Sequence, residues 1–273
     1  MFAMFPNAYA SIFSGFYLAF MLVLVALIFR AVSLEFRAQI DSDAWRRFWD
    51  WAFGLGSLLA ALLFGVAAGN LLRGVPIDAQ GAYQGTFLGL LNPHSLLVGV
   101  MTLVGVTMHG ALYMALKTEG ELQARMGRTA LRLWAVFAAL YIAATATAFF
   151  VAPILFDSIL AKPLFWVFFL AMLAGMAGVP LGLRGARYGR AFLGSCLAAA
   201  GIFGLIGVSY FPRMALSSID PAYSLTIHNA SSTPKTLGVM LAIALIALPF
   251  VLAYTAWIYW IFRGKAKAEA HGY

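Results

Sequence analysis

Seven long apolar segments, separated by short polar segments, run along the chain. We place them at residues 8–30, 49–73, 93–117, 131–153, 163–183, 190–212 and 236–262. Each is long enough to cross the hydrocarbon core of a bilayer as a helix. None has the alternating pattern of a barrel strand, and an open sheet would leave its backbone groups unsatisfied in lipid. The pattern predicts an all-α integral membrane protein, a helical bundle of about seven transmembrane helices that forms a single domain over residues 1–273.

The composition supports this interpretation. The chain is 63% hydrophobic and only 10% charged, whereas about a quarter of the residues in a typical soluble domain are charged. These values exclude a soluble fold. The net charge is +8, but the basic residues lie in loops beside the apolar segments and form no basic face. We therefore expect membrane lipid and no nucleic acid as a partner.

The basic residues divide unevenly between the two sides of the predicted bundle. Of the 18 lysines and arginines, one side receives all but four. The four on the other side are Arg73, Lys162, Arg213 and Lys235. Short basic loops stay in the cytoplasm, so this division predicts a cytoplasmic C-terminus and an N-terminus on the outside.

Few polar side chains enter the apolar segments. The ten acidic residues fall in loops or at segment ends, and Asp50 comes closest to entering a helix. Ion-coupled transporters and proton pumps usually place an acid near the bilayer centre, so this pattern disfavours both, although it leaves a facilitator open. His109 is the one histidine well inside a segment, and Tyr113 follows on the same helical face. His109 is either an axial haem ligand or proton relay, or, as we favour, a neutral histidine bonded to a neighbouring helix.

Several polar residues border the segments on the predicted outer side. Asn70 and Asn92 flank the loop between the second and third segments, where an amide caps or ties down the chain as it leaves a helix. Residues 213–235 are rich in Ser, Thr and Asn and form either a lid or a connector. His228 lies in this outer segment.

Eight short strings follow one another in a recognisable order. They are FSGFY at 13–17, RAVSLEFR at 30–37, WDW at 49–51, GNLLRGVP at 69–76, LLNP at 90–93, KTEGEL at 117–122, LTIHNASS at 225–232 and YTAWIYW at 254–260. In order and spacing, these strings resemble landmarks of the cytochrome bd oxidase subunit II family over almost the whole chain. The resemblance implies nine transmembrane helices, an outside N-terminus, an inside C-terminus, and a location in the bacterial cytoplasmic membrane.

The resemblance also implies a division of labour with a larger subunit I. In that family, subunit I carries two b-type haems and a haem d, oxidises quinol and reduces oxygen to water. Subunit II ligates none of them, so we expect no catalytic, cofactor-binding or metal-binding residue on this chain. Its implied role is to complete the heterodimer and help shape proton or oxygen routes. A structural quinone and a small third subunit are further partners that the resemblance leaves open.

Counting back from the matched strings places the start of this chain near the end of the family's second helix. We therefore expect that the family's first helix and most of its second are absent from it. Two other functions compete with the oxidase subunit. A multi-spanning transporter or facilitator predicts two related halves around a midplane site. The membrane anchor of another quinone-linked redox complex requires two or more histidines facing each other within the spans.

Overall fold

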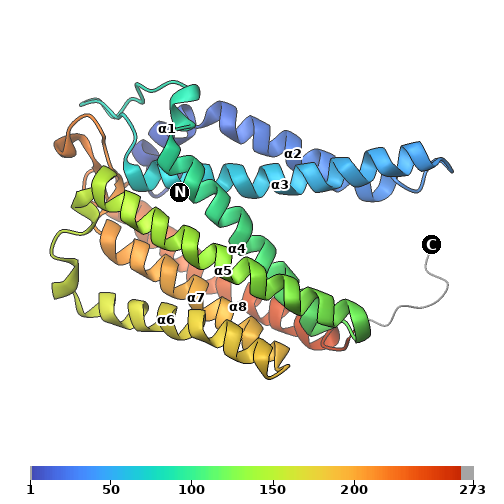
Figure 1. Ribbon diagram of the computed structural model, residues 1–273. Helices are drawn as coiled ribbons and strands as arrows, with labels where there is room; N and C mark the ends of the chain where they lie inside the picture. The colour runs from blue at the N-terminus through green and yellow to red at the C-terminus, as the bar shows by residue number, and fades with distance from the viewer. Residues whose placement is uncertain (1, 266–273) are drawn as a thin grey trace.

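The computed structural model describes residues 2–265 and is almost entirely helical in its apolar parts (Figure 1). Its helices and strands occur in the following order: α1 Pro6–Gly15, α2 Tyr17–Phe36, α3 Asp43–Arg73, η1 Leu88–Leu90, α4 Pro93–Lys117, α5 Gly120–Val151, η2 Pro153–Leu155, η3 Ile159–Ala161, α6 Pro163–Arg184, α7 Tyr188–Tyr210, β1 Arg213–Ala215, η4 Pro221–Tyr223, β2 Leu225–Thr226 and α8 Pro234–Ile261.

Seven of these helices, α2 to α8, are long and apolar enough to cross a membrane. The predicted fold class is therefore confirmed. The bounds of α4 agree with the predicted segment, whereas α3 begins at Asp43 and α5 at Gly120, well before the predicted starts at 49 and 131. Both helices continue into polar sequence because charged side chains on an exposed helix turn do not interrupt backbone hydrogen bonding.

The first predicted segment, 8–30, is wrong as one continuous helix. The chain breaks at Phe16, which separates the short helix α1 from α2. Ala8, Ile12 and Phe16 of this part are buried against the loops that join α3 to α4 and α7 to α8. Their apolar character therefore reflects packing against protein, and hydropathy alone does not distinguish this from burial in lipid.

Glycines allow neighbouring helices to come into backbone contact. Added to Gly65 of α3, a Cβ atom would lie 2.8 Å from Gly99 Cα of α4. A Cβ atom added to Gly201 of α7 would lie 2.5 Å from Met172 N of α6. Such close approach is typical of membrane helix pairs, in which packing replaces the hydrophobic driving force available in water. Figure 1 shows the resulting arrangement, with α2 and α3 as an antiparallel pair and α6 and α7 side by side at the edge of the bundle.

The loops at one end of the bundle fold into a small cap. Strands β1 and β2 pair antiparallel, with Arg213 opposite Thr226 and Ala215 opposite Leu225. A core of buried side chains joins this pair to α1 and to the loop after α3, and includes Val75, Ile77, Ala215 and Leu225. The segment at 213–235 is thus a packed part of the fold rather than a bare connector.

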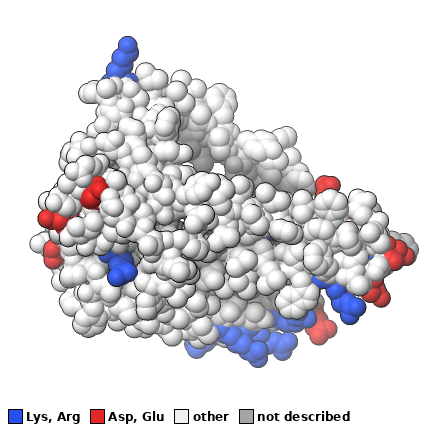
Figure 2. Space-filling view, turned by 90° about the horizontal axis from the view of Figure 1, so that it is seen from above, with Lys and Arg blue, Asp and Glu red and all other residues white. Residues whose placement is uncertain are grey.

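Helix α8 makes the least contact with the rest of the chain. No residue of α8, all of which the structure describes, is buried. A helix that is apolar around its whole circumference belongs in lipid or against other membrane helices. Figure 2 shows a broad uncharged surface on one face of the molecule, with lysines, arginines and acids gathered toward its edges.

Candidate functional site

His109 lies between α4 and α7, within the apolar part of the bundle. Its Nδ1 atom is 2.8 Å from Ser195 Oγ of α7, and the Ser195 hydroxyl donates to Phe192 O at 2.7 Å. Because the serine proton is engaged, His109 Nδ1–H is the donor to Ser195, and Nε2 keeps its lone pair. The rings of His109 and Tyr113 both pack on Phe192, with centroid distances of 4.7 and 5.7 Å. The imidazole therefore links two helices.

His94 was not among the sequence candidates, yet it is the most buried of the described histidines. Its side chain lies at the start of α4 with 6% exposure, and Nδ1 is 2.9 Å from Thr147 Oγ1 of α5. Thr147 donates in turn to Ala144 O at 3.0 Å, so Nδ1–H of His94 is the donor. Among residues 2–265, its Nε2 atom is buried and has no hydrogen-bond partner. The only sequence signal was its position directly after Pro93 at a helix start.

Asn70 and Asn92 come together where α3 ends and α4 begins. Asn92 Nδ2 donates to Asn70 Oδ1 at 2.8 Å, and Asn92 Oδ1 accepts from Ser95 N at 3.0 Å, which caps α4. Asn70 Nδ2 donates to Leu90 O at 2.7 Å and to Val66 O at 2.9 Å. Asn92 thus caps the start of α4, and Asn70 ties the loop at Leu90 to α3.

Asp50 and His228 lie apart from these clusters. Asp50 is inside α3, where it accepts a hydrogen bond from Arg37 Nε at 2.7 Å, and both side chains are about half exposed. The hydrogen bond and the negative charge of Asp50 raise the pKa of the Arg37 guanidinium above its ordinary value. His228 is exposed in the loop between α7 and α8. The six sequence candidates therefore occupy four separate places and form no single site.

The described histidines do not fit the two axial positions of one haem. His94 and His109 are on the same helix, about 22 Å apart along its axis at about 1.5 Å per residue. His228 is in the loop between α7 and α8, and His271 lies outside the described residues. Within residues 2–265 there is also no group of three or more His, Cys, Asp or Glu side chains placed to hold a metal ion.

Comparison with known proteins decides the family. The model of the family described as cytochrome bd terminal oxidase subunit II matches residues 1–262. The chain belongs to this family. A probable cytochrome oxidase subunit 2 from Haemophilus influenzae is 36% identical over 298 residues, which cover 98% of this chain and 79% of the relative. The cytochrome bd ubiquinol oxidase subunit 2 of Bacillus subtilis is 34% identical, over 97% of this chain and 78% of the relative.

A solved structure gives the same fold. The bd oxidase from Geobacillus thermodenitrificans matches with a TM-score of 0.69 at 16% sequence identity, over 90% of this chain and 74% of that chain. As a member of the subunit II family, this chain is a multi-pass membrane subunit of a cytochrome bd-type quinol oxidase. That oxidoreductase complex contains haem and includes a subunit I. The match sets aside the two competing functions, the transporter and the anchor of another redox complex.

Proposed function

We propose that this chain is the subunit that ligates no haem, and that it acts as the helical scaffold against which subunit I carries two b-type haems and a haem d. The observation that carries the scaffold role is the bond from His109 to Ser195, because it ties α4 to α7 in the apolar part of the bundle. Such an interhelical hydrogen bond is worth about 0.6–2 kcal/mol in a membrane.

Two further polar contacts support a structural role. His94 joins α4 to α5 through Thr147, and Trp134 Nε1 of α5 donates to Met176 O of α6 at 2.9 Å. Each contact satisfies a polar group that would otherwise be costly in the apolar interior. Helix α8, none of whose residues is buried, provides a large apolar surface for packing against subunit I and lipid.

The proposal includes the placement of the chain in the membrane. We place residues 1–273 as one domain in the bacterial cytoplasmic membrane, with the N-terminus and the β1–β2 cap outside and the C-terminus inside. The distribution of basic residues supports this orientation. The variant Ser218→Cys is expected to react with a membrane-impermeant maleimide in intact cells. The variant Arg187→Cys is expected to react with it only after the cells are broken. The opposite pattern would reverse the orientation. A structural quinone and a small third subunit remain proposed partners of the assembled complex.

Co-expression with subunit I tests the main proposal. The tagged chain is purified from membranes, and the reduced-minus-oxidised visible spectrum of the complex is recorded for the parent and for His109→Gln. We expect the bands of haem d and of both b-type haems in equal amounts in the two samples, because glutamine keeps a donor for Ser195 but is not a haem ligand of this kind.

Two outcomes would contradict the proposal. Selective loss of one b-type band in His109→Gln, with the complex still assembled, would make His109 a haem ligand. A haem-containing subunit I that never copurifies with the tagged parent chain would contradict the scaffold role. Ser195→Ala serves as the matched control, since it removes the same hydrogen bond and leaves the imidazole in place.

A further inference from the structure

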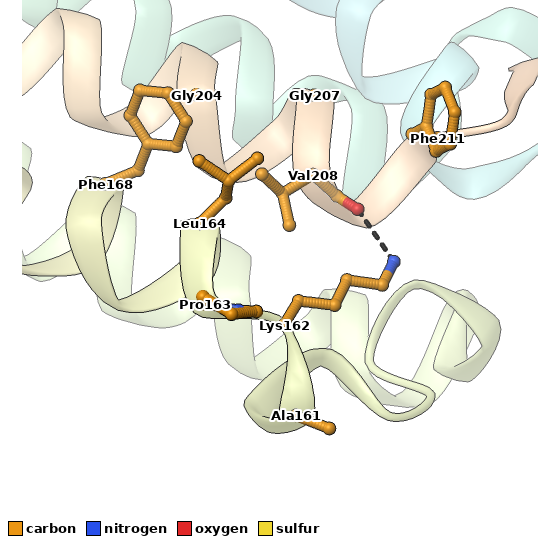
Figure 3. Close-up of a pocket in the computed structure, with 9 residues that line it drawn as sticks. All are labelled: Ala161, Lys162, Pro163, Leu164, Phe168, Gly204, Gly207, Val208 and Phe211. Atoms are coloured by element: carbon orange, nitrogen blue, oxygen red, sulfur yellow. Dashed lines mark hydrogen bonds between the residues drawn. The ribbon is translucent and has the colours of Figure 1, made fainter.

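A cavity of about 550 Å³ lies between α6 and α7, at the end of the bundle that carries the β1–β2 cap (Figure 3). Pro163, Leu164 and Phe168 line it from α6, and Val208 and Phe211 line it from the end of α7. The cavity is open to the outside of the bundle. Its size falls within the range of roughly 300–1,000 Å³ that is usual for small-molecule sites.

The cavity exists because the two helices change their mode of contact along their length. Toward the other end of the bundle, glycines bring the backbones of α6 and α7 together, as at Gly182 and Ala191. Toward the cap, the Phe168 ring lies against Gly204 and holds the helices apart. One turn further along α7, a Cβ added to Gly207 would meet no atom within 4 Å. Gly207 therefore borders open space.

Lys162 is the charged residue at this cavity. Its Nζ donates to Val208 O at 2.9 Å, across the end of the cavity in Figure 3. An ammonium group has three donors, so two remain after this bond. Trp166, one turn into α6, is 47% exposed and donates from Nε1 to Leu160 O at 3.0 Å. Exposed tryptophans of this kind sit at the level of the lipid headgroups, which places Lys162 at the same level.

The position of Lys162 is unusual for a basic residue in this chain. It lies at the end of the bundle that holds four of the 18 lysines and arginines. The basic residues that set the orientation of a membrane protein are concentrated in the loops at the opposite end of the bundle. A role in setting orientation therefore does not account for Lys162. A positive charge at headgroup level above an apolar groove is complementary to a molecule with an anionic head and a hydrocarbon chain.

We propose that this cavity is a binding site for one anionic phospholipid of the leaflet on the cap side. One acyl chain lies in the groove along Phe168 and Gly207, and the phosphate accepts hydrogen bonds from the free donors of Lys162. The bound lipid fills the space between two helices that the protein itself leaves open, and it holds the outer ends of α6 and α7 at a constant separation.

Photo-crosslinking in the assembled oxidase tests this site. The complex of this chain with subunit I is placed in phosphatidylcholine nanodiscs that contain a small fraction of phosphatidylglycerol with a diazirine in its acyl chain. After irradiation, labelled residues are mapped by mass spectrometry. We expect labelling around Phe168 and Phe211 to be about fivefold higher with this probe than with a diazirine phosphatidylcholine, the ratio that corresponds to ~1 kcal/mol for one lysine near the headgroups.

Three variants and one control separate the contribution of the groove from that of the lysine charge. Gly207→Phe fills the open space and is expected to abolish labelling with both probes. Gly110→Phe is its matched control, because a Cβ at Gly110 of α4 also meets nothing within 4 Å; labelling is expected to be unchanged there. Lys162→Gln is expected to remove the preference for phosphatidylglycerol, and Lys162→Arg to keep it.

Four results would overturn the proposal. They are equal labelling by the two probes in the parent, unchanged labelling in Gly207→Phe, absence of any labelling of the groove, and a quinone that copurifies with the parent but not with Gly207→Phe. The haem spectrum of each sample reports assembly separately, so a failure of the scaffold role is distinguishable from a failure of the lipid site. If Gly207→Phe does not assemble, Lys162→Gln decides, because it leaves the groove intact; an unchanged preference for phosphatidylglycerol in that variant would then overturn the proposal.

Discussion

Replacing Gly175 by alanine perturbs the close contact between α6 and α7. The new Cβ atom would lie 2.7 Å from both Gly194 O and Ala198 Cα, whereas ordinary contacts of a Cβ atom measure 3.4–4 Å. Both neighbours are backbone atoms of α7, so no side-chain rotation relieves the clash. Ala198 N lies closer still to the new Cβ atom. The two helices must therefore separate locally by more than roughly 0.7 Å, since a packed interface keeps its atoms at van der Waals distance.

The cost follows from two opposing effects. Overpacking a well-packed site costs about 1–3 kcal/mol, and the rigid backbone neighbours favour the upper half of that range. Alanine has a helix propensity that is higher than that of glycine by about 1 kcal/mol. We therefore expect a net loss of roughly 1–2 kcal/mol in the free energy of unfolding. In chains of this size, each kcal/mol lowers the midpoint of thermal unfolding by about 2–4 °C, so the midpoint of Gly175→Ala is expected to fall by roughly 2–8 °C.

The assay is thermal inactivation of the purified oxidase. Samples are heated, and the fraction that still elutes as an intact, haem-containing complex is measured by size exclusion. Gly110→Ala is the matched control, because it makes the same chemical change where a Cβ meets no atom within 4 Å, and it is expected to be neutral or slightly stabilising. If Gly175→Ala and Gly110→Ala had the same midpoint, the argument that backbone contact holds α6 to α7 would be refuted.

Other parts of the structure lead to further predictions. His109→Ala and Ser195→Ala are each expected to lower stability by about 0.6–2 kcal/mol and to be non-additive in a double-mutant cycle of thermal midpoints; additive effects would mean that the two side chains do not interact. Backbone Ala82 N–H and the Gln84 side chain hold the pKa of Asp78 below its usual range. The Asp78 carboxylate therefore stabilises the loop fully at pH values above about 3.9, its pKa in the unfolded chain. This stabilisation is lost as the pH falls through the lower pKa that Asp78 has in the folded protein. The protection of the amides of this loop, measured relative to their intrinsic exchange rate at each pH, is expected to fall in acid in the parent, whereas Asp78→Asn should show low protection at every pH. Asn92→Ala removes the cap of α4 at a cost of about 0.5–2 kcal/mol in thermal stability, while Asn92→Ser should retain most of it.

Much of the candidate site could be anticipated from local sequence. Asn92 precedes Pro93 at the start of an apolar segment, and both its capping role and the bounds of α4 follow from that pattern. The partner of His109 could not be anticipated, because Ser195 is 86 positions away in the sequence. The contact of His94 with Thr147 could not be anticipated either, because packing of α4 against α5 determines the exposure of His94.

The class of structure and the family follow from the order of residues along the chain. Apolar segments long enough to cross a bilayer, the uneven distribution of basic residues and the ordered strings from FSGFY to YTAWIYW all follow from local composition and order. Tertiary structure alone decided the break at Phe16, the burial of His94 and the cavity beside Lys162. These features depend on which distant segments meet, and hydropathy does not distinguish an apolar residue that faces lipid from one that faces another part of the protein.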